Sequence, residues 1–171
     1  DSENSSYGQI TVSKITNCMD FSMTGRAEDC YEFAVAGRGN VRAKFSLDIG
    51  GCVDITYCDW VEHGQNLFGC VGLRQKKYCI LNKQYEKVEY EKLVPKIIEH
   101  MNTMPYIDKL GRVYKYGEFF PVEISRFAYN QTQFFDLFPM FKEETLNEGY
   151  TWFDQSKRSH NPTITFDHLP L

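Results

Sequence analysis

The chain has 171 residues, of which 42% are hydrophobic and 15% are aromatic, and its formal net charge is −4. That length suits one domain, or a small domain with a packed extension, and the aromatic content excludes a disordered chain. The negative charge argues against nucleic-acid binding by the whole surface, and no apolar run reaches the roughly 18 residues that predict a membrane span.

The N-terminal stretch, DSENSSYGQI, is polar and contains neither a Met nor the apolar core of a signal peptide. It has the character of a fragment or of a processed chain. Because the cysteines are also scattered as single thiols, we expect a cytoplasmic location.

Three segments of the first half align with one another: FSMTG at 21–25, FAVAG at 33–37 and FSLDI at 45–49. Alternation of large and small side chains predicts short strands, and glycines punctuate the ends of these segments. An antiparallel meander and a β-solenoid both fit this pattern. We favour the solenoid, because it stacks equivalent side chains coil upon coil. Phe21, Phe33 and Phe45 are 12 residues apart, and we expect their rings to stack in one interior.

Beyond residue 80 the pattern becomes helical. Apolar residues recur at intervals of three and four from Tyr90 to Met104. Because Pro95 would kink a continuous helix or begin a new one, we predict two helical segments, 86–94 and 95–104.

The remaining elements are short. Asn130 and Gln133 have the spacing of a capping box at a helix start, and Gly149 suits a helix end. The segments TWFD and PTITFDHLP predict one or two closing strands.

The predicted fold is mainly β with a helical C-terminal part, an α+β chain in which helices cap a short β-solenoid or repeat sheet. Residues 1–80 form the β-rich, solenoid-like region. Residues 81–171 form a helical cap with short C-terminal strands, packed on the open end of the first region, where apolar side chains and strand edges would otherwise be exposed.

Several long motifs of the chain resemble a known family: FGCVGLRQKKYCILNKQY, EYEKLVPKIIEHM, GEFFPVEISRFAYNQT and PTITFDHLP. The sequence is similar to uncharacterised Cys-rich repeat proteins of candidate-phyla, metagenome-derived bacteria. The resemblance covers about residues 66–170. Residues 1–65 share only the general character of the family, with fewer cysteines. The resemblance implies a repetitive, Cys-punctuated segment and, in many members, zinc-ribbon segments outside the region present in this chain.

All six cysteines lie in the N-terminal half of the chain: Cys18, Cys30, Cys52, Cys58, Cys70 and Cys79. Small buried thiols explain them best, and disulfides or a metal site are the alternatives. Zinc would be held by Cys52, Cys58, Cys70 and Cys79, with His63 able to replace one of them. Structural zinc sites usually take ligand pairs from knuckles two to four residues apart, and none of the six has so close a partner. We therefore predict no cofactor.

The passage from His63 to Tyr85 contains no acidic residue, although the chain as a whole is acidic. Its basic and aromatic residues form a candidate interaction patch: Arg74, Lys76, Lys77, Lys83, Tyr78 and Tyr85. One interpretation is protection of an exposed strand edge by Lys and Arg. The other is contact with an acidic partner or with nucleic acid, for which Phe68, Tyr78 and Tyr85 would offer stacking faces.

Catalytic motifs are missing from the sequence. It contains no GxSxG, HExxH, Walker A or dinucleotide-binding signature. Asp54 and Asp59 would suit a β-helix lyase or hydrolase only if they faced each other across a groove. We therefore predict a non-catalytic binding or scaffolding module for an unidentified protein or other acidic partner. A nucleic-acid-associated module is the second hypothesis, and a carbohydrate-active enzyme on a β-helix the third.

Overall fold

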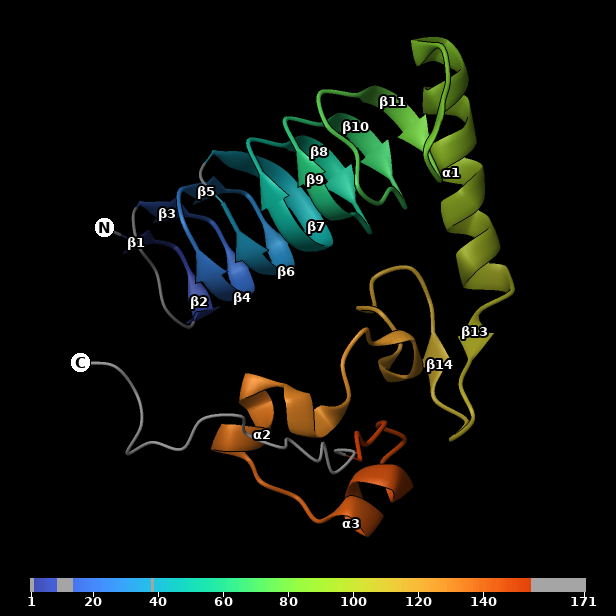
Figure 1. The fold of residues 1–171 in the computed structure, drawn as a ribbon. Helices are drawn as coiled ribbons and strands as arrows, with labels where there is room; N and C mark the ends of the chain where they lie inside the picture. Colours follow the sequence, from blue (N-terminus) through green and yellow to red (C-terminus); the bar gives the residue numbers. More distant parts are fainter. Residues whose placement is uncertain (1, 9–13, 38, 155–171) are drawn as a thin grey trace, which may run out of the picture. The chain divides into compact units, whose positions relative to one another are not determined.

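The computed structural model describes residues 2–8, 14–37 and 39–154. It forms two compact units, Asp1–Ile124 and Ser125–Leu171. The first unit contains a β-solenoid of about five turns (Figure 1). This confirms the predicted fold class, a mostly β chain whose few helices belong mainly to its C-terminal part.

Twelve strands build the solenoid sheet. They are β1 (Ser2–Glu3), β2 (Ser6–Gly8), β3 (Ile15–Thr16), β4 (Met19–Thr24), β5 (Ala27–Glu28), β6 (Tyr31–Ala36), β7 (Asn40–Gly50), β8 (Val53–Thr56), β9 (Asp59–Glu62), β10 (Gln65–Phe68), β11 (Lys77–Ile80) and β12 (Lys83–Gln84). All of their pairings are parallel except that of β11 with β12.

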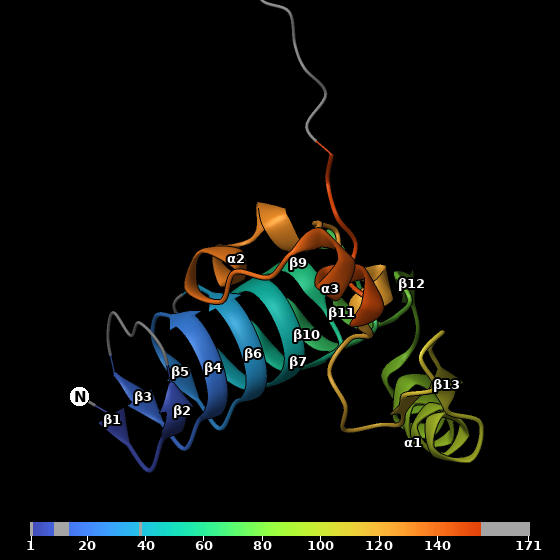
Figure 2. The same ribbon diagram turned by 90° about the horizontal axis from the view of Figure 1, so that it is seen from below.

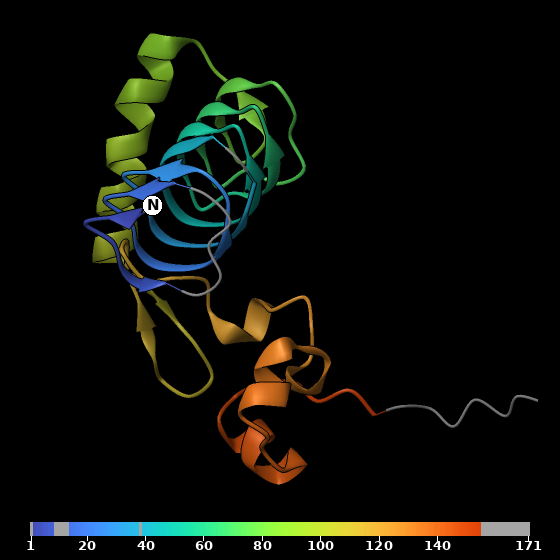
Figure 3. The same cartoon turned by 90° about the vertical axis from the view of Figure 1, so that its left-hand side faces the viewer.

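The register of the strand pairs sets the length of one coil. Val53 pairs with Gln65, and Gln65 pairs in turn with Lys77. Figure 2 shows the coils succeeding one another along the stack, and Figure 3 looks along it from the N-terminal end, where the coils overlap. Because this register is kept from β7 to β11, residues at equivalent positions of these coils lie above one another on the same side.

Within each coil the chain turns after every third residue. The buried residues of the central coils are spaced by three: Ile49, Cys52, Ile55, Cys58, Val61, Gly64, Leu67 and Cys70. Left-handed backbone has the same spacing and falls at Asp48, Gly51, Asp54, Tyr57, Trp60 and His63. Each side of the coil therefore has one inward side chain, and each corner has one residue with positive φ.

This narrow coil leaves buried N–H groups that point inward, and small polar side chains accept them. The N–H of Cys52 donates to Oδ1 of Asn40 at 3.0 Å, and the N–H of Cys58 donates to Oγ of Ser46 at 3.1 Å. The N–H of Ala43 donates to the sulfur of Cys30 at 3.4 Å. A buried N–H without an acceptor is costly. Each of these side chains supplies the acceptor for one inward N–H of the coil that follows it.

Cysteine suits this position because its thiol both donates and accepts. Each of the six thiols donates to the carbonyl oxygen two residues before it, at 3.2–3.5 Å. The sulfur of Cys30 also accepts an N–H, that of Ala43. All six thiols are free and buried.

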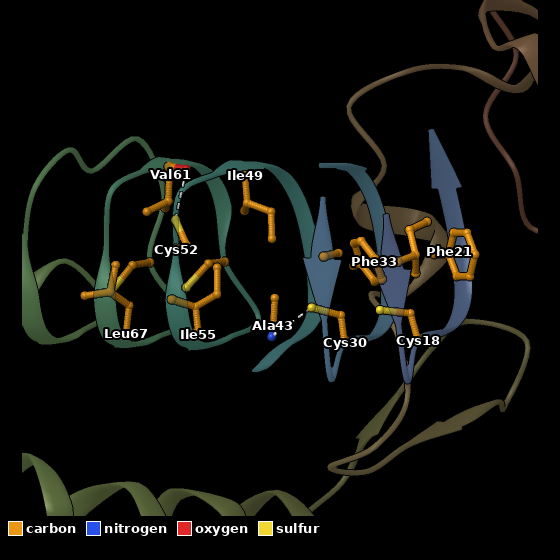
Figure 4. Close-up of a cluster of buried hydrophobic side chains, with 14 of the residues drawn as sticks. Cys18, Phe21, Cys30, Phe33, Ala43, Ile49, Cys52, Ile55, Val61 and Leu67 are labelled. Atoms are coloured by element: carbon orange, nitrogen blue, oxygen red, sulfur yellow. Dashed lines mark hydrogen bonds between the residues drawn. The ribbon is translucent and has the colours of Figure 1, made fainter. Parts of the chain in front are cut away.

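The prediction that three phenylalanines share one interior is wrong for Phe45. Phe21 and Phe33 do stack inside the solenoid, with ring centroids 5.9 Å apart (Figure 4). The next coil is one residue longer, so Phe33 pairs with Ser46 and not with Phe45. Phe45 consequently lies at an outer corner, where its ring stacks on that of Tyr57 at 4.8 Å.

Phe45 and Tyr57 belong to an outer apolar cluster that also holds Phe68, Ile80 and Tyr90. Tyr90 comes from the helix α1 (Lys87–Thr103), which packs its apolar residues on this face of the solenoid: Leu93, Val94, Ile97, Ile98 and Met101. The predicted break at Pro95 is wrong, because Pro95 lies inside one continuous helix. The packing of the apolar stripe on both sides of it keeps the helix whole.

The segment after α1 returns to the solenoid. A two-stranded hairpin of β13 (Tyr106–Ile107) and β14 (Val113–Tyr114) is followed by the 3-10 helix η1 (Val122–Ile124). Between them, the Tyr57 hydroxyl donates to the carbonyl of Glu118 at 2.9 Å and accepts the N–H of Gly117 at 3.0 Å. Burial raises the pKa of Tyr57 to about 12.

The second unit packs short helices around Tyr129. They are η2 (Tyr129–Gln131), α2 (Gln133–Leu137) and α3 (Lys142–Asn147). The hydroxyl of Tyr129 donates to the carbonyl of Phe138 at 2.7 Å, and its ring lies 4.9 Å from that of Tyr150. Gly149 has φ +82° just after α3, as expected for a helix end.

The predicted capping box of Asn130 and Gln133 is wrong. The side chain of Asn130 exchanges two hydrogen bonds with the backbone of Phe153, at 2.8 and 2.9 Å, and is not available to cap a helix. Residues 151–154 of the predicted closing strands are not in a strand, and the segment PTITFDHLP lies outside the described residues.

The accepting role of the inner thiols predicts the cost of removing them. Cys30→Ala should leave the buried N–H of Ala43 without an acceptor and lower the free energy of unfolding by about 1–3 kcal/mol beyond the loss of volume. Cys30→Ser should avoid most of this penalty, because the Ser46 hydroxyl accepts an inward N–H in the same way. Urea denaturation would measure the difference.

Cys79→Ala provides the matched control, since Cys79 is equally buried and its sulfur accepts no N–H among the described residues. An unfolding free energy equal in Cys30→Ala and Cys79→Ala would contradict the accepting role.

The same environment predicts low thiol reactivity. Burial raises the pKa of Cys52, and the hydrogen bond with a neighbouring thiol raises that of Cys58. Such bonds lower the pKa of Cys18 and Cys70 to about 7. All six sulfurs are buried, so a reagent cannot reach even the more acidic thiols. The folded protein at neutral pH should therefore be almost inert to Ellman's reagent, and all six thiols should react in denaturant. Lys92→Cys on the exposed side of α1 is the positive control. Rapid labelling of the native thiols under the same conditions would refute this prediction.

Candidate binding surface on the last coil

The four basic residues of the predicted patch all lie at the C-terminal end of the solenoid. We call residues 71–82 the last coil. Arg74 forms a parallel bridge with Glu62 of the coil before it, and Lys77 begins β11. Lys83 lies on β12, which follows the last coil directly. Together with Lys76, they are exposed.

Two of these cations already have partners. The guanidinium Nε of Arg74 lies 3.1 Å from the carboxylate of Glu62, in a pair whose side chains are 73% and 53% exposed, so solvent weakens it. The ammonium of Lys83 lies over the ring of Tyr85, 5.1 Å from its centroid. Lys76 and Lys77 form no ion pair with any residue that the structure describes. They are the unneutralised charges of this surface.

The two tyrosines of the patch have a different environment. Tyr78 and Tyr85 are partly buried against the outer apolar cluster, and the ring of Tyr78 meets that of Tyr90 edge to face at 5.8 Å. Their rings therefore contribute mainly to the packing of α1. The structure gathers the basic residues on the end of the solenoid and turns the tyrosines toward the helix.

Large apolar side chains accompany the basic residues and escaped the sequence analysis. Leu81 is 76% exposed and Val71 is 53% exposed, both in the last coil. Trp60, 67% exposed, lies at a corner of the preceding coil. Gly72 occupies the equivalent corner of the last coil and has no side chain with which to cover the Trp60 ring. The three-residue spacing of corner positions is the signal that would have found these residues.

The end of the sheet is also closed at this surface. The side-chain amide of Asn82 donates to the carbonyl of Val71 and accepts its N–H, both at 2.8 Å, as a neighbouring strand would. β12 folds back antiparallel on β11, with Ile80 opposite Lys83. Both features support the interpretation that part of this passage protects a strand edge.

The cysteines proposed as zinc ligands lie on different sides of the coil. Cys58 and Cys70 face inward from one side, in successive coils, whereas Cys52 and Cys79 face inward from two others. Within the described ranges, no three His, Cys, Asp or Glu side chains come together as a metal site would need. The absence of a cofactor remains a prediction.

The two carboxylates considered for catalysis do not form a pair either. Asp54 is engaged with Arg42, whose Nε and Nη2 lie 2.5 and 2.7 Å from its two oxygens. Asp59 begins β9, on another side of the coil, where Leu47 pairs with it.

Comparison with known proteins found no match to a family model, to a curated protein or to a solved structure. The resemblance to the candidate-phyla family therefore remains a prediction. Among the helices of the described residues, none has the length and apolar character needed to cross a membrane.

Proposed function

We propose that the protein is a non-catalytic binding module that contacts an acidic protein partner through its last coil. The observation that carries this proposal is the combination of two unneutralised lysines, Lys76 and Lys77, with the exposed apolar side chains of Val71 and Leu81. Opposite charges accelerate and orient an encounter, and apolar side chains supply contact area that charges alone do not.

Nucleic acid is the second candidate partner, favoured by the clustering of cations on one end of an acidic chain. A single-stranded nucleic acid gains much of its affinity from aromatic side chains on which its bases stack. Tyr78 and Tyr85 are committed to the packing of α1, so we rank this partner below an acidic protein.

The proposal predicts that reversing two charges abolishes binding without unfolding the chain. Lys76→Glu/Lys77→Glu should keep the far-ultraviolet spectrum and the melting temperature close to those of the wild type, because exposed charge changes usually cost within about 0.5 kcal/mol each. Its fluorescence anisotropy with a labelled Glu- and Leu-rich peptide should show no binding, where the wild type binds at low salt and more weakly as salt rises.

Lys92→Glu/Lys96→Glu is the matched control, with the same charge change on exposed positions of α1. This variant should bind as the wild type does. Equal loss in both double variants, or no wild-type binding to the peptide at low salt, would sink the proposal.

Labelled single-stranded RNA and DNA form the second arm of the same titration. Binding to them with a steep salt dependence, and not to the peptide, would identify the second candidate as correct. If the passage serves only to protect the edge, the Lys76→Glu/Lys77→Glu variant should self-associate in size-exclusion chromatography while wild type and variant both fail to bind.

A further inference from the structure

An open recess lies between the outside of the middle coils and helix α1. Its volume is about 410 Å³, within the range of small-molecule sites. The residues that line it are Asp29, Arg42, Lys44, Asp54, Thr56, Asn66 and Tyr90. Six of them come from four successive coils of the solenoid, and Tyr90 comes from α1.

A continuous column of polar side chains forms one wall of the recess. Asp29, Arg42, Asp54 and Asn66 occupy the same corner in successive coils, each with positive φ. The column extends toward the N-terminus, where the amide of Asn17 donates to Asp29 at 2.9 Å. The bidentate pair of Arg42 and Asp54 fixes its centre, with N···O distances of 2.5 and 2.7 Å.

Two further lining groups have unused hydrogen-bonding capacity. Tyr90 is only 8% exposed, and its hydroxyl makes no hydrogen bond with any described residue. The hydroxyl oxygen itself is not fully buried, and the recess is the space that Tyr90 borders. Lys44, which pairs with Thr56 between β7 and β8, forms no ion pair with the described part of the chain.

The charges of the lining cancel. Asp29 and Asp54 contribute two negative charges, and Arg42 and Lys44 contribute two positive ones. The recess therefore has both donors and acceptors in its lining and no net formal charge. A ligand whose hydroxyl groups each donate and accept fits such a lining, because every hydroxyl can bridge a carboxylate to an ammonium, an amide or a phenol.

We propose that this recess binds a neutral polyhydroxylated ligand, a carbohydrate of one or two sugar units, with the Tyr90 hydroxyl and the Lys44 ammonium as its main contacts. The Asp54 and Asn66 side chains supply the acceptors beside them. This site is independent of the last-coil contact, since it shares no residue with it.

The test is a titration of the isotopically labelled chain with individual sugars, followed by protein-detected NMR. The probes are glucose, galactose, mannose, N-acetylglucosamine, cellobiose and maltose, each to about 50 mM, since single sugars bind weakly in open sites. We expect saturable shifts of the Lys44, Thr56 and Asn66 amides with at least one of them.

Two conservative variants test the contacts. Tyr90→Phe removes only the hydroxyl, and Lys44→Met removes only the charge. Each variant should weaken the affinity for the sugar by about fivefold to tenfold, as loss of one hydrogen bond does. Tyr116→Phe and Lys92→Met are the controls, because both residues lie outside the recess. The affinity of these control variants for the sugar should stay within about twofold of that of the wild type.

Each contrary result overturns the proposal. Saturable shifts with inorganic phosphate or acetate, and none with a sugar, would make the recess an anion site. Shifts with a sugar that fall elsewhere, or that persist unchanged in both Tyr90→Phe and Lys44→Met, would show that this recess is not the binding site. No response to any sugar at the highest concentration would have the same meaning.

Discussion

The whole solenoid depends on one backbone constraint, a left-handed residue at every third position. From Arg42 to Leu81 this spacing is unbroken. Residues other than Gly, Asn and Asp pay a steric penalty there, of about 1–2 kcal/mol each, yet aromatic residues such as Tyr57 and Trp60 occupy it. The conformation persists because each coil is hydrogen-bonded to its neighbours: the N–H of His63 donates to the carbonyl of Gly50 at 2.8 Å, and that of Tyr57 donates to the carbonyl of Lys44 at 3.1 Å. A coil that lost its neighbours would lose the interactions that offset the strain.

This constraint gives the interior and the outer surface of the solenoid different kinds of residue. With three residues a side, the interior has room for one side chain per side, so it is filled by small thiols, aliphatic residues and two stacked phenylalanines. The corner positions point outward, and each corner recurs once in every coil. One corner therefore forms the polar column of Asp29, Arg42, Asp54 and Asn66, and another forms the aromatic stack of Phe45 and Tyr57 that receives α1. Residues far apart in sequence become neighbours along a corner, which is how the recess is assembled.

The same geometry explains what the sequence predicted and what it did not. The spacing of Phe21 and Phe33 predicted the solenoid correctly, because identical residues at a constant interval mark stacked coils. The same spacing misplaced Phe45, because one inserted residue moves every following side chain to the next position along the coil. The exposure of Lys76 and Lys77 followed from composition alone. The recess did not, because its lining spans residues 29 to 90 and none of them is unusual by itself. The period of three was also hidden, since left-handed corners are occupied by residues as different as Asp54, Tyr57 and His63.

The cysteines suggest metal ligation by their number, but in this fold they make hydrogen bonds that hold the coils together. Metal ligation requires thiolates, but the thiol proton of each cysteine here is donated to a carbonyl oxygen of its own coil. Deprotonating Cys58 would remove its hydrogen bond to Thr56 and place a charge in a core with no compensating cation among its members. Metal ligation would require each thiol to lose this proton, whereas the hydrogen bonds of the coils require the thiol to keep it. The appearance of Asn40 and Ser46 at equivalent inward positions supports the hydrogen-bonding role, because an amide and a hydroxyl accept an inward N–H as well as sulfur does.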